Sequence, residues 1–297
     1  MPSGTHPRAG SPHPGGAPLP AGDVRPAGTP RLDGVRAVVT GATSGLGAAM
    51  ADALLRSGAR VAVAARETPR LGAAVSRWRG EGLDADALPL DVRDAAFADA
   101  AAASIRARWG GLDLLVNNAG IGMRTVNPRF MVEPLPFWQV LPDRFADLVA
   151  TDLTGYFLVS RAFVPLFLDQ GRGRIVNVTM NHETMRRAGF VPYGPARAGA
   201  ESLGLIMAED LRPHGIAVNL LLPGGATETG MIPDDAPPDI RARLLPASVM
   251  GPPIVFLASP EAEGLTGRRI VARDFDRWLD EARERGLPNT RTEDDVR

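Results

Sequence analysis

The sequence lacks cysteine and has few histidines. Without any cysteine among its 297 residues, the chain can form no disulfide, no catalytic thiolate and no cysteine–zinc site. It has only four histidines, and two of them, His6 and His13, lie near the N-terminus. The composition therefore argues against a histidine-rich metal site.

A strong charge of either sign is also missing, as is any long apolar run. The formal net charge is -1, which favours neither a nucleic-acid partner nor an anionic membrane. No apolar stretch reaches the length of a membrane span, and the N-terminus lacks the apolar core of a signal peptide. These absences predict a soluble, cytoplasmic protein.

The two ends of the chain differ from the middle. Residues 1–30 hold eight prolines and six glycines with almost no large apolar side chains, so we predict a disordered tail. Residues 288–297 predict a second, charged tail. Just before it, Phe275, Trp278, Leu279 and Ala282 recur at helical spacing and predict a short amphipathic helix. Residues 31–287 remain for one domain.

Within this domain, short apolar runs alternate with helical patterns. The expected strands are 36–40, 60–65, 112–117, 173–179, 216–222 and 268–272, with a further strand ending at "LPLDV". The expected helices are 46–57, 69–79, 95–108, 143–170, 194–211 and 239–258. Such alternation predicts an α/β fold with a doubly wound (Rossmann) parallel sheet of about seven strands. Ligands bind such sheets beyond the carboxyl ends of the strands.

The first expected strand runs into a glycine-rich loop, "TGATSGLG", Thr40–Gly47. Glycines allow close backbone approach, and the helix that follows directs free N–H groups at whatever lies above the loop. A strand, a glycine loop and a helix in this order indicate a phosphate site of the dinucleotide-binding kind.

Several motifs occur in the order seen in one family. They are Thr-Gly-x-x-x-Gly-x-Gly, "NNAG" at Asn117–Gly120, a Tyr-x-x-x-basic pair and "PGG" after the sixth strand. Over residues 33–272 the chain resembles the single-domain short-chain dehydrogenase/reductase family. The resemblance implies a nicotinamide dinucleotide held by Thr40, Gly41, Ser44, Gly45, Leu46, Gly47, Asp91, Val92, Asn117, Asn118, Ala119, Gly120, Tyr193, Arg197, Pro223, Gly224 and Thr227. For the nicotinamide amide, Thr227 and Thr229 both remain candidates.

Cofactor choice depends on the end of the second strand. A carboxylate there would bind both ribose hydroxyls and repel a 2′-phosphate, but Ala65 occupies that place. Arg66 can pair with a phosphate through two parallel hydrogen bonds, and Arg70 is close enough in sequence to help. We therefore expect NADP(H) to be preferred, with NAD(H) possible.

The resemblance implies four catalytic roles, and three of them fall on unusual residues. Tyr193 fits the proton-exchanging tyrosine, but Arg197 takes the place of the lysine four residues later. Arginine keeps the positive charge and can support a tyrosinate, but it does not pass a proton under ordinary conditions. Asp152 stands in the place of the family's asparagine, where it can bind a water or pair with an arginine.

The fourth role belongs to a serine that binds the reacting oxygen, and Met180 occupies its place. A thioether cannot donate a hydrogen bond. Three neighbours can supply the missing donor: Thr179, if the strand has already ended there, Asn181 and His182. The sequence leaves this choice open.

Two long connections are candidates for the substrate side. Residues 121–143 are rich in apolar side chains, and residues 223–239 follow the sixth strand. Both are expected to cover the site. The apolar residues that line a pocket or close the loops are Met123, Phe130, Phe137, Trp138 and Met231, and arginines that could hold a substrate anion are Arg124, Arg129, Arg186 and Arg187.

Two functions remain possible at this stage. The first is an oxidoreductase that interconverts a carbonyl and an alcohol, with Tyr193 as general acid/base and Arg197 as cationic support. The second is a catalytically impaired NADP(H)-binding sensor or partner subunit. By resemblance we also expect a homodimer or homotetramer that uses the helices at 143–170 and 194–211.

Overall fold

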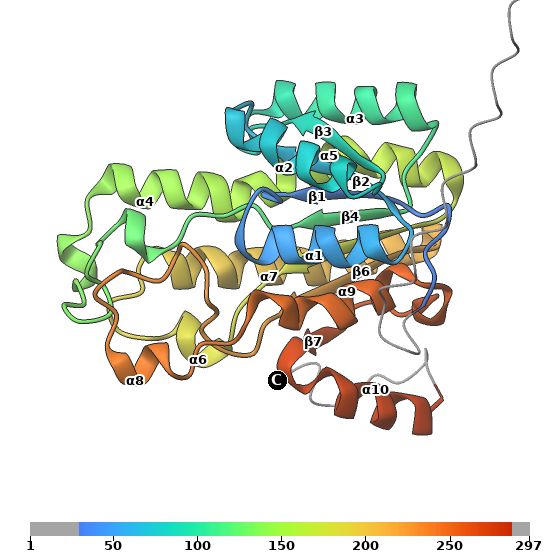
Figure 1. Cartoon of the computed structure of the whole chain (residues 1–297). Helices are drawn as coiled ribbons and strands as arrows, with labels where there is room; N and C mark the ends of the chain where they lie inside the picture. The colour runs from blue at the N-terminus through green and yellow to red at the C-terminus, as the bar shows by residue number, and fades with distance from the viewer. Residues whose placement is uncertain (1–29, 287–297) are drawn as a thin grey trace, which may run out of the picture.

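The sheet has seven parallel strands, as the sequence predicts. A computed structural model describes residues 30–286, so the predictions for the tails lie almost entirely outside the described residues. The strands run in the order β3-β2-β1-β4-β5-β6-β7 (Figure 1). Their bounds are β1 Arg36–Thr40, β2 Arg60–Ala65, β3 Ala85–Pro89, β4 Leu114–Asn117, β5 Gly173–Val178, β6 Ile216–Leu222 and β7 Arg269–Val271.

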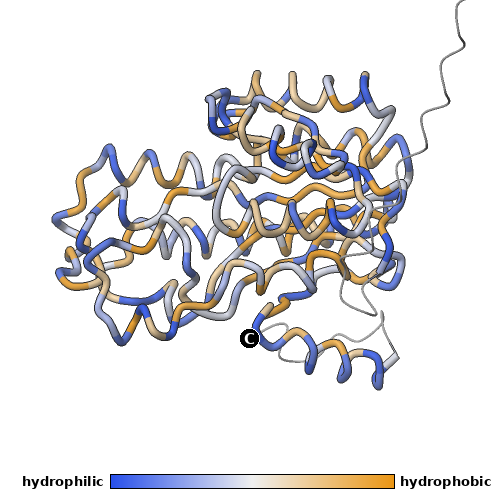
Figure 2. Tube along the Cα trace, viewed as in Figure 1, coloured by the Kyte–Doolittle hydropathy of each residue, from blue (hydrophilic) through white to orange (hydrophobic). Residues whose placement is uncertain are grey.

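Helices cover both faces of the sheet. One face packs against α1 (Gly45–Arg56), α2 (Pro69–Gly80) and α9 (Gly251–Ala258), and the other against α3 (Ala95–Trp109), α5 (Gly155–Gln170) and α7 (Tyr193–Leu211). Hydrophobic residues run along the central strands (Figure 2). Because both faces are covered, the strands read as continuous apolar runs.

The strand order reverses between β1 and β4, and this is where doubly wound sheets form a crevice. Short elements project beyond the sheet on one side, on the left in Figure 1. They are η1 (Met123–Thr125), η2 (Phe137–Gln139), α4 (Pro142–Val149), α6 (His182–Met185) and α8 (Pro238–Arg241). The long connections predicted to cover the site therefore lie on this side.

The expected helix over 143–170 contains an irregular turn. The chain runs from α4 through a π-helical turn, η3 (Ala150–Thr154), directly into α5. Such a turn inserts an extra residue and often marks a functional site. Asp152 lies in it and is fully buried.

The expected helix over 239–258 is wrong, because the segment is broken. After α8, Leu245 forms a bridge with Thr227, and its N–H donates to the carbonyl of Ala226 at 2.8 Å. Pro246 then precedes a 3-10 turn, η5 (Ala247–Met250), and α9 begins only at Gly251. A tertiary contact between two loops therefore replaces the middle of the expected helix.

The C-terminal amphipathic helix is confirmed as α10 (Phe275–Glu284). Phe275 is buried, and its ring lies 5.6 Å from that of Phe256 in α9. Within residues 30–286, no helix has the length and apolarity needed to cross a membrane. The remaining short 3-10 turns are η4 (Arg212–His214), η6 (Pro260–Ala262) and η7 (Ala272–Asp274).

Candidate active site

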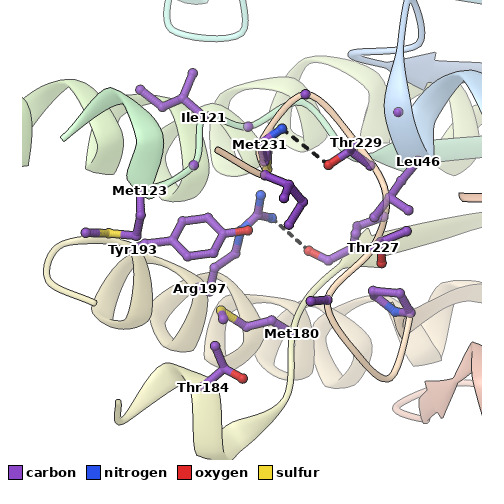
Figure 3. Close-up of a pocket in the computed structure, with 18 of the residues that line it drawn as sticks. Leu46, Ile121, Met123, Met180, Thr184, Tyr193, Arg197, Thr227, Thr229 and Met231 are labelled. Carbon is purple, nitrogen blue, oxygen red and sulfur yellow. Dashed lines mark hydrogen bonds between the residues drawn. The ribbon is translucent and has the colours of Figure 1, made fainter. Parts of the chain in front are cut away.

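One cavity of about 780 Å³ opens at the carboxyl ends of the central strands. Its wall combines the loops after β1, β4, β5 and β6 with the start of α7 (Figure 3). Most of the predicted site residues line it, namely Gly41, Ser44, Gly45, Leu46, Asn118, Ala119, Gly120, Thr179, Tyr193, Arg197, Pro223, Gly224 and Thr227. Segments far apart in the sequence thus form a single site.

The glycine loop forms one end of the cavity. Gly41 and Gly45 adopt left-handed backbone angles, with φ of 66° and 57°. A Cβ on Gly41 would come within 2.8 Å of the Ala119 Cα, so only glycine fits between the two loops. Ser44 is the N-cap of α1, but its side chain makes no capping bond. The first N–H groups of the helix therefore remain available for an anion.

Some predicted cofactor residues hold the loops together, and of these only Asn118 also lines the cavity. Thr40 Oγ accepts the N–H of Asn118 at 2.9 Å and that of Ala119 at 3.0 Å. Asn118 donates its side-chain amide to the Thr40 carbonyl, and Gly47 lies so close to that amide that a Cβ would clash. Asn117 is buried, donates to Ser160 and Asn177, and does not line the cavity, so its expected contact with the cofactor stays a prediction.

The end of β2 carries two exposed arginines. Arg70 lines the cavity, and Arg66 does not, although it lies close enough to Asp91 to lower that carboxyl's pKa. Neither arginine has a carboxylate ion-pair partner in the described part of the chain. Asp91 pairs with Arg93 at 2.8 Å, and this bond is the main reason for its lowered pKa. Val92 packs against Gly155, outside the cavity wall.

Arg197 is buried and held by three groups on other elements. Its Nη1 donates to the hydroxyl of Tyr156 at 2.7 Å and to the carbonyl of Val178 at 3.0 Å. Its Nη2 lies 3.0 Å from Oδ2 of Asp152. Burial alone would lower the pKa of Arg197, but the two tyrosine oxygens and Asp152 raise it well above its ordinary value. The guanidinium is thus a fixed positive charge.

Asp152, in the π-helical turn η3, contacts Arg197 but does not itself line the cavity. Its Oδ1 accepts the N–H of Ile121 at 2.8 Å. Burial raises the pKa of Asp152 to about 6, against the opposing effects of Arg197 and of the Ile121 N–H. Gly120 leaves room for this pair, because a Cβ there would clash with Arg197 and come within 3.0 Å of Asp152.

Tyr156 belongs to the same group, and the sequence reasoning missed it. Its hydroxyl accepts from Arg197 and donates to the Val178 carbonyl at 3.1 Å. Burial raises the pKa of Tyr156 to about 12. A signal was present, because Tyr156 follows Asp152 by four residues in a predicted helix and therefore shares its face.

Tyr193 lies beside Arg197 at the start of α7 (Figure 3). Its ring centroid is 5.3 Å from the guanidinium carbon. The ring also packs against a small apolar cluster of Met123, Phe130 and Phe190. Unlike Tyr156, Tyr193 is only partly buried and lines the cavity, so its hydroxyl is the one that a ligand can reach.

The structure separates the three candidates for the missing donor. Thr179 lines the cavity, but its hydroxyl donates to Glu201 at 2.7 Å. His182 points to the other oxygen of Glu201, also at 2.7 Å, and does not line the cavity. Arg269 joins them by donating to Glu201 and to the Met180 carbonyl. Asn181 lines the cavity, and its amide makes no hydrogen bond within residues 30–286.

The comparisons with known proteins agree with this site. The family described as short chain dehydrogenase matches residues 36–237. The chain belongs to the short-chain dehydrogenase family. As in the family, it is an oxidoreductase of the class that acts on alcohols and carbonyl compounds with a nicotinamide cofactor.

Its relatives are named dehydrogenases and reductases. Gluconate 5-dehydrogenase of Gluconobacter oxydans is 32% identical, over 81% of this chain and 93% of that protein. The 3-oxoacyl-[acyl-carrier-protein] reductase of Vibrio harveyi is 34% identical, over 80% and 96%. A solved gluconate 5-dehydrogenase from Burkholderia cenocepacia, in complex with NADP and tartrate, is 28% identical with a TM-score of 0.72, over 81% and 94%.

In this short-chain dehydrogenase the two loops over the cavity are joined by ion pairs. Arg124 pairs with Asp234 at 2.8 Å, and Arg129 with Asp235 at 3.2 Å. The expectation that these two arginines hold a substrate anion is therefore not supported by their surroundings. Thr227 and Thr229 both line the cavity, so the choice between them stays open.

Proposed function

We propose that the chain is an NADP(H)-dependent oxidoreductase that interconverts a carbonyl and an alcohol, with Tyr193 as general acid and base. One observation carries this proposal. Among residues 30–286, three arginines line the cavity, and no aspartate, glutamate or histidine does. Tyr193 carries the one phenolic hydroxyl of this wall, and a phenol gives up and takes back a proton far more readily than the serine and threonine hydroxyls beside it.

The wall at the glycine end fits a dinucleotide. The left-handed glycines leave room for a pyrophosphate, and the open helix N-terminus of α1 favours its charge. Arg70, with Arg66 beside it, would hold the 2′-phosphate of NADP(H) through charge-assisted hydrogen bonds. When bound, the nicotinamide supplies or accepts the hydride.

Arg197 acts in this proposal as a fixed cation. It holds a positive charge beside Tyr193, so the tyrosinate left after proton donation is stabilised. It passes no proton, because a guanidinium stays protonated. Tyr193 lines the open cavity, so its proton is replaced from solvent through that cavity.

Asn181 is our candidate for the donor that binds the reacting oxygen. Thr179 donates its hydroxyl proton to Glu201 and so has none left to give. Asn181 presents an amide at the cavity wall with no other partner in residues 30–286. In this assignment Glu201 holds the loop that carries Asn181, through its hydrogen bonds to Thr179 and His182.

The alternative function is an NADP(H)-binding sensor with impaired catalysis. It is favoured by the burial of the Arg197–Asp152 pair, in which the negative charge offsets much of the positive one. The glycine end of the cavity suits both functions, so cofactor binding alone does not separate them.

Turnover by the purified chain and its Tyr193→Phe variant separates the two functions. NADPH oxidation is followed with a panel of ketones and aldehydes, and NADPH binding is measured by calorimetry. We expect Tyr193→Phe to lose about 10²–10⁴-fold in kcat while NADPH affinity changes little. Asn181→Ala should lower kcat more than Thr179→Val does, because Thr179 only helps to hold the loop that carries Asn181. Tight NADPH binding without turnover on any substrate would favour the sensor.

For the assembly we propose a homodimer or homotetramer. Exposed apolar side chains occur on the helices expected to form the interface, namely Phe145, Phe157, Leu168, Leu205 and Ile206. Light scattering during size-exclusion chromatography tests this directly. A monomeric mass at micromolar concentration would contradict the proposal.

A further inference from the structure

The substrate half of the cavity is lined by adaptable apolar side chains. Four methionines, Met123, Met131, Met180 and Met231, contribute to its wall. Phe130 and Phe190 add two buried rings to this wall, which meet edge to face with their centroids 5.7 Å apart. Methionine fits irregular shapes because its chain is unbranched and polarizable. Such a wall accepts an apolar body without requiring one precise outline.

The charge of the cavity wall is nevertheless positive. Its charged side chains are Arg70, Arg187 and Arg197, with no acidic residue among them. The ion pair with Asp152 neutralises much of the charge of Arg197. Arg70, near the start of α2, is assigned to the 2′-phosphate of the cofactor. Only Arg187 then remains without an assigned anion.

Arg187 is held at the edge of the apolar half. It follows α6, and its guanidinium carbon lies 5.5 Å from the ring centroid of Phe190. It makes no ion pair within residues 30–286, whereas Arg124 and Arg129, on the loop opposite, are both paired with aspartates. Its neighbour Arg186 is also exposed but does not line the cavity. In the described part of the chain, Arg187 is therefore the cavity-lining cation of the substrate side that has no ion-pair partner.

We propose that the substrate is an amphipathic anion: a carbonyl or alcohol compound with an apolar body and a carboxylate that pairs with Arg187. The inference rests on the proposed oxidoreductase function and names the substrate class of the same site. The apolar body would lie on Phe130, Phe190 and the methionines, with the reacting carbon toward Tyr193. Arg187 would be a residue that determines specificity.

The ratio of kcat/KM for a keto acid to kcat/KM for its methyl ester tests this proposal. The substrates are para-acetylbenzoate and levulinate, each compared with its methyl ester, and the proteins are wild type, Arg187→Met and Arg186→Met. Because Arg187 is exposed, we expect kcat/KM to favour each acid by about two- to fivefold, mainly through KM. The preference should disappear in Arg187→Met and persist in Arg186→Met. Added salt should weaken it in wild type.

A binding measurement separates this inference from the proposed reaction. Calorimetry follows para-acetylbenzoate binding to each protein saturated with NADP⁺. Binding to wild type and Arg186→Met, but not to Arg187→Met, would support the anion site even if no ketone turns over. Equal kcat/KM for acid and ester would overturn the inference while leaving the oxidoreductase function intact. It is also overturned if Arg187→Met keeps the acid preference, or if wild type neither binds nor reduces the acids.

Discussion

The two ends of the cavity are built in different ways. At the cofactor end the wall is mostly backbone and glycine, shaped by the left-handed angles of Gly41 and Gly45. At the catalytic end the wall depends on buried side chains that bond to one another, with Arg197 held between Tyr156 and Asp152. The three residues that the sequence predicts to be unusual for the family, Asp152, Met180 and Arg197, all lie at the catalytic end.

This difference shows how the unusual residues can coexist. The glycine wall needs the absence of side chains at fixed places, whereas buried side chains that bond to one another must change together, since an unmatched group costs free energy. The sequence contains no lysine, so all 33 of its Lys+Arg residues are arginine. Arg197 therefore follows the composition of the whole chain, and its neighbours accommodate the guanidinium.

The largest expected effect comes from restoring the family's lysine. An ammonium cannot reach Tyr156, the Val178 carbonyl and Asp152 in the way the planar fork does. We expect Arg197→Lys to lower the free energy of unfolding by about 2–4 kcal/mol and kcat/KM by about tenfold or more. Chemical denaturation and steady-state kinetics provide the measurements.

Two further variants serve as controls for Arg197→Lys, one at an exposed arginine and one that also changes Asp152. Arg212→Lys, at an exposed pair with Glu209, should change stability by less than about 0.5 kcal/mol. Combining Arg197→Lys with Asp152→Asn should recover part of the loss, with a coupling energy above about 1 kcal/mol. The new lysine would be unique in the chain, so its amine can be titrated as a single labelled NMR signal. Full activity in Arg197→Lys would mean that the site needs only a cation.

The fold was predictable because its signals are local and repeated. Buried parallel strands alternate with helices along the whole domain, and the glycine loop follows β1 as expected. The expected helix over 239–258 failed because Leu245 bonds to the loop at Thr227, a contact that no local pattern reports. Tertiary pairing overrode helical periodicity there.

The sequence predicted which residues form the site better than it predicted which of them bond to one another. The sequence indicated Tyr193, Arg197 and Asp152, but not that Asp152 and Arg197 form a buried pair. Glu201 was missed for a physical reason: it follows Arg197 by four residues, which suggests a helical pair, yet it bonds to Thr179 and His182 instead. Which side of a strand or loop faces a helix depends on packing that spacing does not encode.

At the cofactor end, removing charge should have a moderate and selective effect. We expect Arg66→Ala and Arg70→Ala each to raise KM for NADPH by about three- to tenfold and to leave KM for NADH almost unchanged, because both arginines are exposed. The ratio of kcat/KM for the two cofactors is the measurement. Arg77→Ala, on the same helix as Arg70 but outside the cavity wall, is the control. Equal changes for both cofactors would refute the phosphate assignment.

The smallest effect concerns Asp152 and the dependence of stability on pH. Burial raises its pKa to about 6, above the value near about 4 in an unfolded chain, so the folded protein binds this proton more tightly. The stability contributed by this proton is fully present below about pH 4 and is lost as pH rises through about 6. Asp152→Asn removes this dependence. Its melting temperature relative to wild type should therefore rise by a few degrees between about pH 5 and pH 8. A relative melting temperature that stays constant over this range would show that Asp152 is already ionised at the lower pH.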